Sequence, residues 1–275
     1  SSSTKRAPPH TPTVTALASS LGGSTRSSSS LSSEDGDAKQ LGSKRGKNAV
    51  KLLPSYLTDA RSVEQYHPED CPHGALQLSV AENQMLEDLL VPALSIPPKD
   101  GFTSDLIYYQ QTQGRPQIRS VMSQFLHRTL KLPTPPNPDG LTLGAGCNAV
   151  LENLCFCLAD AGDGVLIPTP YYAAFEFDLG SRAGLNIIPV EPPATTKFSP
   201  DDAGWYYPTS EALETAYQNN PNVKILLLSH PNNPLGVCYP KHVLEDILDW
   251  AESREVHIVS DEIYGGSVYG EKGEA

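Results

Sequence analysis

The amino-acid sequence predicts an α/β fold in which a mostly parallel sheet carries helices on both of its faces. Two observations predict this fold. From Pro116 onward, short segments such as residues 224–228 are apolar almost throughout, and they alternate with longer segments whose apolar residues recur at helical spacing. A strand without polar alternation is buried on both faces, and parallel sheets reach that state because helical crossovers cover them.

Composition divides the 275 residues into three parts. Residues 1–50 contain 13 Ser and no aromatic residue. Such a segment cannot bury enough apolar surface to offset the entropy of ordering it, so we expect residues 1–50 to be disordered. Residues 51–115 are irregular and rich in Pro and Gly, whereas residues 116–275 carry the regular alternation of helices and strands.

The expected elements follow in order along the chain. A first helix is expected at about residues 81–94, and a second after Pro116, where Ile118, Val121 and Phe125 fall on one apolar face. Further helices are expected around residues 151–158, 173–183 and 210–219, and from residue 241 onward. The expected strands are residues 141–143, 165–167, 186–190, 224–228 and 256–260.

Charge and hydropathy exclude two classes of partner. The chain has 20 Lys and Arg against 32 Asp and Glu, a net charge of −12. Because residues 1–50 contribute +4, the remainder carries −16, which repels a phosphate backbone and argues against nucleic acid. No apolar run approaches the length of a membrane span. We therefore expect a soluble, cytoplasmic protein.

The cysteines indicate a reducing compartment and no metal site. Their number is odd, and none forms a CxxC pair. Two of them, Cys155 and Cys157, would point to different faces of a helix and so cannot share one metal. We expect free thiols at all five positions: Cys71, Cys147, Cys155, Cys157 and Cys238.

The turn after the first expected strand supports more than one hypothesis. Gly144, Gly146 and Ala149 match the pattern G-x-G-x-x-A, which is typical of nicotinamide dehydrogenases. That hypothesis requires an acidic residue at the end of the next strand, and residues 167–172 contain none. The same glycines let the backbone approach an anion, and a helix start offers N–H groups to a phosphate. A tight turn that binds nothing is the remaining alternative.

Other strand ends supply the rest of a ligand site, since ligands of parallel sheets bind beyond the carboxyl ends of the strands. Tyr172 could stack on a flat ring, although a core aromatic is the alternative. Asn233 lies between prolines and could donate to a ligand, or belong to a plain turn. Asp261, three residues before Tyr264, should have a cationic partner, either a ligand or a salt-bridging side chain. Together these side chains suit a phosphorylated pyridine with a phenolic oxygen.

Four motifs resemble those of fold-type I pyridoxal-phosphate enzymes, the class I/II aminotransferases, and more narrowly the 1-aminocyclopropane-1-carboxylate synthase branch. They are LSVAENQ at residues 78–84, CLAD at 157–160, PTPYY at 168–172 and NPLG at 233–236. The resemblance covers residues 50–270. It implies an N-terminal arm and part of a small domain in residues 51–115, and an incomplete cofactor-binding large domain in residues 116–275. It also implies a homodimer that acts on an α-amino acid through aldimine and α-carbanion chemistry.

The resemblance further implies roles for individual residues around the cofactor pyridoxal 5′-phosphate. The catalytic pair would be Asp261, which holds the ring nitrogen protonated, and Tyr264, which binds the phenolic oxygen together with Asn233. Tyr172 would stack on the ring. The phosphate would bind backbone N–H groups of Gly146, Cys147 and Asn148, and the substrate side would be lined by Ala81, Glu82 and Asn83.

The sequence departs from the family pattern in two ways. Thr112 stands where the family has a Tyr that reaches a neighbouring subunit's phosphate, and Cys147 and Asn148 replace the last two residues of a Gly-Ala-Thr loop. The Schiff-base lysine is expected several dozen residues after Asp261, where this chain has only 14 residues and one Lys, Lys272. We therefore expect a piece of a longer protein that lacks its catalytic lysine; the alternative is a non-catalytic module that retains the cofactor cleft.

Overall fold

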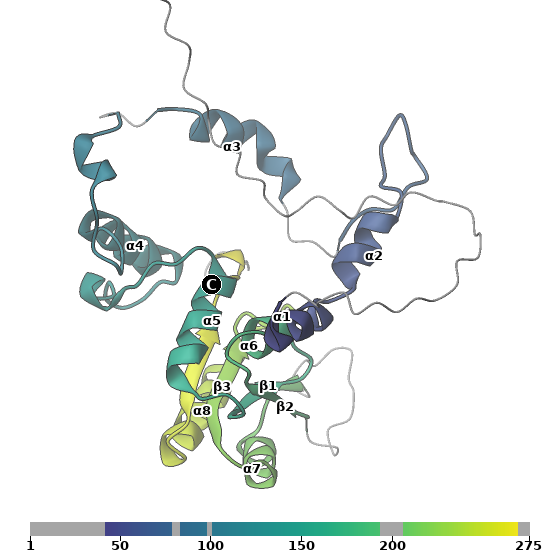
Figure 1. The fold of residues 1–275 in the computed structure, drawn as a ribbon, viewed down its shortest axis with the longest axis vertical. Helices are drawn as coiled ribbons and strands as arrows, with labels where there is room; N and C mark the ends of the chain where they lie inside the picture. Colours follow the sequence, from purple (N-terminus) through teal and green to yellow (C-terminus); the bar gives the residue numbers. More distant parts are fainter. Residues whose placement is uncertain (1–41, 79–82, 98–100, 193–205, 269–275) are drawn as a thin grey trace, which may run out of the picture. The chain divides into compact units, whose positions relative to one another are not determined.

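The computed structural model describes residues 42–78, 83–97, 101–192 and 206–268 (Figure 1). Its centre is a four-stranded sheet with the order β2-β1-β3-β4, in which every pair of neighbours is parallel. The strands are β1 (Gly164–Pro168), β2 (Asn186–Val190), β3 (Val223–Ser229) and β4 (His257–Asp261). The predicted α/β class and parallel sheet are confirmed.

Helices cover both faces of the sheet. α5 (Cys147–Leu158) and α6 (Phe175–Gly180) share one core cluster with the odd-numbered residues of β1, whereas α7 (Ser210–Asn219) and α8 (Lys241–Ser253) share a second cluster with Leu166. Successive strand residues point to opposite faces, so a wholly apolar strand feeds both clusters. Complete burial of a Leu or Ile side chain contributes about 1.5–3 kcal/mol, and β1 and β3 supply most of these side chains.

The connections create a crevice at one edge of the sheet. β1 is followed by α6 and leads outward to β2, while β3 is followed by α8 and leads in the other direction to β4. The neighbours β1 and β3 therefore send their chains to opposite sides. In parallel sheets this arrangement opens a binding crevice at the carboxyl ends of the two strands.

Further elements precede the sheet and one follows it. The helices are α1 (Lys44–Ala49), α2 (Tyr56–Ser62), α3 (Glu87–Leu94) and α4 (Pro116–Thr129). Single 3₁₀ turns are η1 (Val50–Leu52), η2 (Gln84–Leu86), η3 (Ser104–Ile107), η4 (Pro138–Gly140) and η6 (Gly265–Ser267). Among the helices of the described residues, none combines the length and hydropathy of a membrane span.

Three expectations need correction. Residues 44–49, which we expected to be disordered, form α1 because the Ser43 hydroxyl caps the helix by accepting the Gly46 N–H at 3.1 Å; residues 1–41 lie outside the described residues. The helix expected at residues 81–94 begins only at η2, and residues 81 and 82 also lie outside the described residues. The helix expected at residues 173–183 is shortened to α6, which ends at a glycine.

The strand expected at residues 141–143 is also absent. Besides a local bond from the Leu141 N–H to the Pro138 carbonyl at 3.2 Å, this segment makes one backbone hydrogen bond to a distant residue among those described, from the Leu143 N–H to the Gln113 carbonyl at 2.9 Å. Its partner is a turn, and a turn offers no second strand with which a ladder could form. The alternation Leu-Thr-Leu fits a strand locally, but pairing decides whether a strand forms.

Helix α4 buries a different face from the one its apolar residues suggest. Ile118, Val121 and Phe125 are half exposed or more, whereas Arg119 and Ser123 are buried. Met122, Leu126 and Leu130 of the predicted apolar face are half buried, so that face is only partly covered by the described residues.

Candidate active site

A cavity of about 810 Å3 opens at the carboxyl edge of the sheet. Its walls come from the ends of β3 and β4 with the residues that follow them, from the segment after β1 together with α6, and from the start of α5. Leu53, Pro54, Tyr56 and Leu78 line it from the part of the chain before the sheet. Six residues that the sequence analysis singled out line it together: Cys147, Asn148, Tyr172, Asn233, Asp261 and Tyr264. Gly146 immediately precedes this wall as the N-cap of α5.

The start of α5 offers backbone donors that have no acceptor among the described residues. Gly146 has φ +89°, which L-residues rarely adopt, and it provides no side-chain cap. The first intrahelical bond joins the Val150 N–H to the Gly146 carbonyl at 3.2 Å, so the N–H groups of Cys147, Asn148 and Ala149 lie ahead of the helical ladder. Together with the helix dipole, these donors suit an anion.

The side chain of Asn148 already has a partner. Its Nδ2 donates a short hydrogen bond to Oδ1 of Asp178 on α6. Asp178 is only 4% exposed, and burial raises the pKa of its carboxyl, with the charges of Asp261 and Glu152 acting in the same direction. The Asn148 backbone N–H is not engaged by this contact and stays available for an anion, while the side chain is turned toward Asp178.

Asp178 is a site residue that sequence reasoning missed. It lines the cavity beside Asn148. The sequence does contain a signal for this residue. Phe175 and Leu179 are fully buried, and Asp178 shares their helix face because residues three and four apart lie on the same side of a helix. An acidic residue within that apolar stripe marks a buried polar position.

Asp261 ends β4 and is 8% exposed. Its Oδ1 accepts hydrogen bonds from the Cys147 thiol at 3.4 Å and the Ile263 N–H at 3.2 Å. Among the described residues, no Lys, Arg or His forms an ion pair with it. The structural salt bridge that we considered is therefore not found there, and a buried carboxylate without a cation is costly.

Burial raises the pKa of the Cys147 thiol to about 11, and the nearby charges of Asp261 and Asp178 add to the shift. The thiol therefore stays protonated near neutral pH and can act as the donor to Asp261. All five cysteines are free, as expected. No group of His, Cys, Asp and Glu in the described part of the chain is arranged to hold a metal ion.

The ring of Tyr172 is held at two points. Its edge meets Phe175 in a T-shaped contact with ring centroids 5.5 Å apart. Its hydroxyl accepts a hydrogen bond from the Tyr56 hydroxyl at 3.4 Å. Sequence reasoning missed Tyr56, because nothing in the sequence links α2 to the strand ends.

The two asparagines after β3 have separate tasks. Asn232 is 5% exposed and bonds within its own turn, donating to the Tyr239 hydroxyl at 3.1 Å and accepting the Leu235 N–H at 3.1 Å. Asn233 is half buried, and its N–H donates to the Ser229 hydroxyl at 3.2 Å. The side chain of Asn233 is thus the one left to face the cavity.

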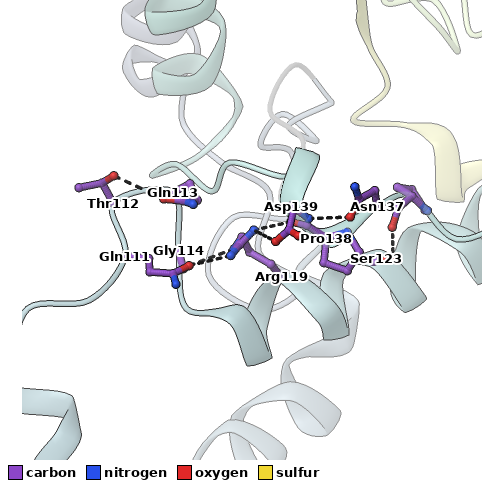
Figure 2. Close-up of polar contacts among 10 residues, drawn as sticks. Gln111, Thr112, Gln113, Gly114, Arg119, Ser123, Asn137, Pro138 and Asp139 are labelled. Atoms are coloured by element: carbon purple, nitrogen blue, oxygen red, sulfur yellow. Dashed lines mark hydrogen bonds and ion pairs between the residues drawn. The ribbon is translucent and has the colours of Figure 1, made fainter.

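Other predicted residues lie elsewhere. Ala81 and Glu82 fall outside the described residues, and Asn83 is exposed and does not line the cavity. Thr112 is exposed too, and its hydroxyl donates to the Gln113 side chain at 3.5 Å (Figure 2). The structure therefore groups the residues expected around the cofactor. Of the three expected substrate residues only Asn83 is among the described residues, and it does not line the cavity.

Arg119 organises the turn that contains Thr112, as Figure 2 shows. Its guanidinium donates to the Gly114 carbonyl at 3.1 Å, the Pro138 carbonyl at 2.6 Å and the Gln111 side chain at 2.8 Å. It also forms an ion pair of 3.3 Å with Asp139. The same turn accepts a backbone hydrogen bond from the Leu143 N–H through the Gln113 carbonyl. Arg119 therefore supports the segment that leads into the start of α5.

Comparison with known proteins identifies the family. The family described as Aminotransferase class I and II matches residues 77–275, well over half of the chain. The chain belongs to the class I and II aminotransferases. This family depends on pyridoxal phosphate.

The relatives of this aminotransferase-family chain include plant synthases. The 1-aminocyclopropane-1-carboxylate synthase 6 of Arabidopsis thaliana is 34% identical over 231 residues, which are 79% of this chain and 45% of that protein. The 1-aminocyclopropane-1-carboxylate synthase 5 of Oryza sativa subsp. japonica is 36% identical over 220 residues, 75% of this chain and 40% of that protein. This chain thus spans less than half the length of these curated relatives.

Solved aminotransferases share the fold. The aspartate aminotransferase of Thermotoga maritima is 21% identical, with a TM-score of 0.56 over 85% of this chain and 57% of that one. The aspartate aminotransferase of Thermus thermophilus with maleate is 22% identical, with a TM-score of 0.53 over 80% and 53%. At these identities the likeness establishes the fold alone.

The residues of this aminotransferase-family site fit the family's cofactor. A protonated pyridine nitrogen is the cation that Asp261 lacks among the described residues. A phosphate is the acceptor that the first N–H groups of α5 lack within the part of the chain that the structure describes. Both groups belong to one molecule, and Tyr172 lies on the same cavity wall.

Proposed function

We propose that this chain forms the cofactor half of a pyridoxal-phosphate site in an aminotransferase-class enzyme that acts on an α-amino acid and is similar to 1-aminocyclopropane-1-carboxylate synthases. One observation carries the proposal: Asp261 is buried at the rim of the cavity and has no ionic partner among the described residues. The 34–36% identity to the plant synthases supports the narrower assignment.

Each side chain has a distinct task in this proposal. The N–H groups of Cys147 and Asn148, next to Gly146, bind the phosphate. Tyr172 orients the ring by stacking, and Asp261 holds the proton on the ring nitrogen because its negative charge stabilises the pyridinium. When bound, pyridoxal phosphate supplies an electron-withdrawing ring that stabilises negative charge at the substrate α-carbon.

The remaining assignments complete the site. Asn233 and Tyr264 donate to the phenolic oxygen, which orients the ring within its plane. Ala81, Glu82 and Asn83 are assigned to the substrate side. We further propose that the protein acts as a cytoplasmic homodimer and that the lysine which attaches the cofactor covalently is absent from these 275 residues.

The experiment that tests this function is a titration of the purified chain with pyridoxal phosphate, followed by its absorbance and by quenching of protein fluorescence. We expect saturable, non-covalent binding that Asp261→Asn weakens by about tenfold or more, since the variant keeps the shape and loses the charge. Asp249→Asn, on the exposed face of α8, is the matched control and should bind like the wild type.

Borohydride reduction and peptide mass mapping complete the experiment. We expect no single lysine to be labelled in stoichiometric amount. Stoichiometric labelling at one lysine would show that the catalytic lysine is present after all. Equal affinity of wild type and Asp261→Asn would remove the basis of the cofactor assignment.

A further inference from the structure

The chain segment around η1 and the start of α2 reaches the cavity at the carboxyl edge of the sheet. η1 packs against α6, and the Leu52 side chain lies 3.2 Å from the position that a Cβ would take at Gly180. Directly after η1, the chain contributes Leu53, Pro54 and Tyr56 to the cavity lining. The absence of a side chain at Gly180 therefore allows this approach, and the residues after η1 cover one side of the cavity.

Within this segment, Tyr56 makes a specific polar contact. It begins α2 and is half buried, and its hydroxyl donates to the Tyr172 hydroxyl at 3.4 Å. Phe175 meets the same Tyr172 ring edge-on. The Phe175 contact restricts the ring of Tyr172, and the hydrogen bond from Tyr56 additionally fixes the hydroxyl at the far end of the side chain. The two contacts together therefore restrict the ring more than the Phe175 contact alone.

We infer that Leu53, Pro54 and Tyr56 form a wall of the cofactor pocket and that Tyr56 is a positioning residue, which holds the ring of Tyr172 in place through their hydroxyl contact. The effect on cofactor affinity rests on the proposed function. The contact itself does not, because it exists within the chain without a ligand.

The physical consequence follows from orientation. A stacking ring contributes to binding only when it lies parallel to the ligand, and a side chain already fixed in that orientation loses less entropy on binding. Replacing Tyr56 by Phe keeps the ring of residue 56 and removes only its hydroxyl. We therefore expect the Kd for pyridoxal phosphate to rise about two- to tenfold, the net effect of one hydrogen bond.

The test uses the full chain and two measurements. The first is a pyridoxal-phosphate titration of Tyr56→Phe, with Tyr66→Phe as the control, because Tyr66 follows in the same region, is 45% exposed and does not line the cavity. The second is a double-mutant cycle of Tyr56→Phe and Tyr172→Phe on the unfolding equilibrium without ligand. We expect the two substitutions to be coupled by about two- to tenfold in that equilibrium.

The outcomes separate the inference from the proposed function. A wild-type chain that binds no pyridoxal phosphate overturns the proposed function, and the cycle then still decides whether Tyr56 contacts Tyr172. Additive effects in the cycle overturn the inference whatever the wild type binds. Cofactor affinity that is equal in Tyr56→Phe and Tyr66→Phe overturns the positioning role and leaves the proposed function standing.

Discussion

The thiol of Cys147 donates a hydrogen bond to Oδ1 of Asp261 across 3.4 Å, joining the start of α5 to the end of β4. The contact links the proposed phosphate donors to the proposed ring-nitrogen partner. It also occupies one carboxylate oxygen, to which the Ile263 N–H donates as well. Both described hydrogen bonds to this carboxylate thus reach Oδ1, and we expect Oδ2 to be the oxygen that pairs with a ligand cation.

The first prediction concerns the reactivity of this thiol. With a pKa of about 11, about one Cys147 in a thousand is ionised at pH 8, and the thiolate is the nucleophile. Cys157 and Cys238 are exposed. Labelling with a disulfide reagent at pH 8, followed by mass mapping, should modify these two cysteines well before Cys147.

The same experiment tests the contact with Asp261. Asp261→Asn removes a negative charge beside the thiol, so the pKa of Cys147 should fall and its labelling should become several-fold faster. Burial is the larger cause of the shift, so the labelling rate should not reach that of the exposed cysteines. Unchanged labelling of Cys147 in Asp261→Asn, relative to Asp249→Asn, would contradict the contact.

The second prediction concerns Arg119, whose side chain is 3% exposed. Arg119→Met leaves the Gly114 and Pro138 carbonyls without their donor, so we expect the free energy of unfolding to fall by about 2–4 kcal/mol. Urea denaturation measures the change. Arg128→Met on the same helix is the control, because Arg128 is exposed, and a loss of similar size there would rule out the network as the cause.

The sequence predicted the sheet well because its signal is local. In β3, an apolar run bounded by polar residues needs no knowledge of its neighbours, and α7 was predicted at its observed bounds. The strand at residues 141–143 was wrong because a strand depends on a partner, which lies elsewhere in the chain. Arg119 was missed for a similar reason. Its burial depends on contacts with distant residues, whereas the sequence of α4 by itself indicates only an apolar face.

The site residues could be predicted where the order of the strands alone brings them together. The ends of parallel strands meet at one edge, so the positions of Tyr172, Asn233 and Asp261 in the sequence already placed them together. Tyr56 and Asp178 were not found, because each reaches the cavity through the packing of a helix rather than through a strand end. The exposed position of Asn83 was equally beyond prediction from a motif.

The third prediction concerns alkaline stability. Burial raises the pKa of the Cys155 thiol from 9.0 to about 11, so the folded state favours the protonated form. The unfolded chain releases this proton at lower pH than the folded chain. The stabilising effect is therefore fully present below about pH 9 and is lost as the pH rises from about 9 to about 11.

Melting temperatures measured across this range, in wild type and Cys155→Ala, check the prediction. The variant should be less stable by about 1 kcal/mol at neutral pH, because a buried sulfur is removed from the core. Its melting temperature should then fall less steeply above pH 9 than that of the wild type. Parallel curves for the two proteins would exclude ionisation of Cys155 as a cause.

The last prediction concerns two truncations that differ only in α1, η1 and α2. Removing residues 1–41 should leave the affinity for pyridoxal phosphate unchanged, because this Ser-rich stretch has no aromatic side chain to add to a pocket. Removing residues 1–62 deletes Leu53, Pro54 and Tyr56 from the cavity lining, so the Kd should rise at least as much as in Tyr56→Phe, about two- to tenfold or more. Titration of both truncated proteins, with circular dichroism to verify that each is folded, makes the comparison. Equal affinity in the two folded truncations would show that the cavity does not depend on this segment.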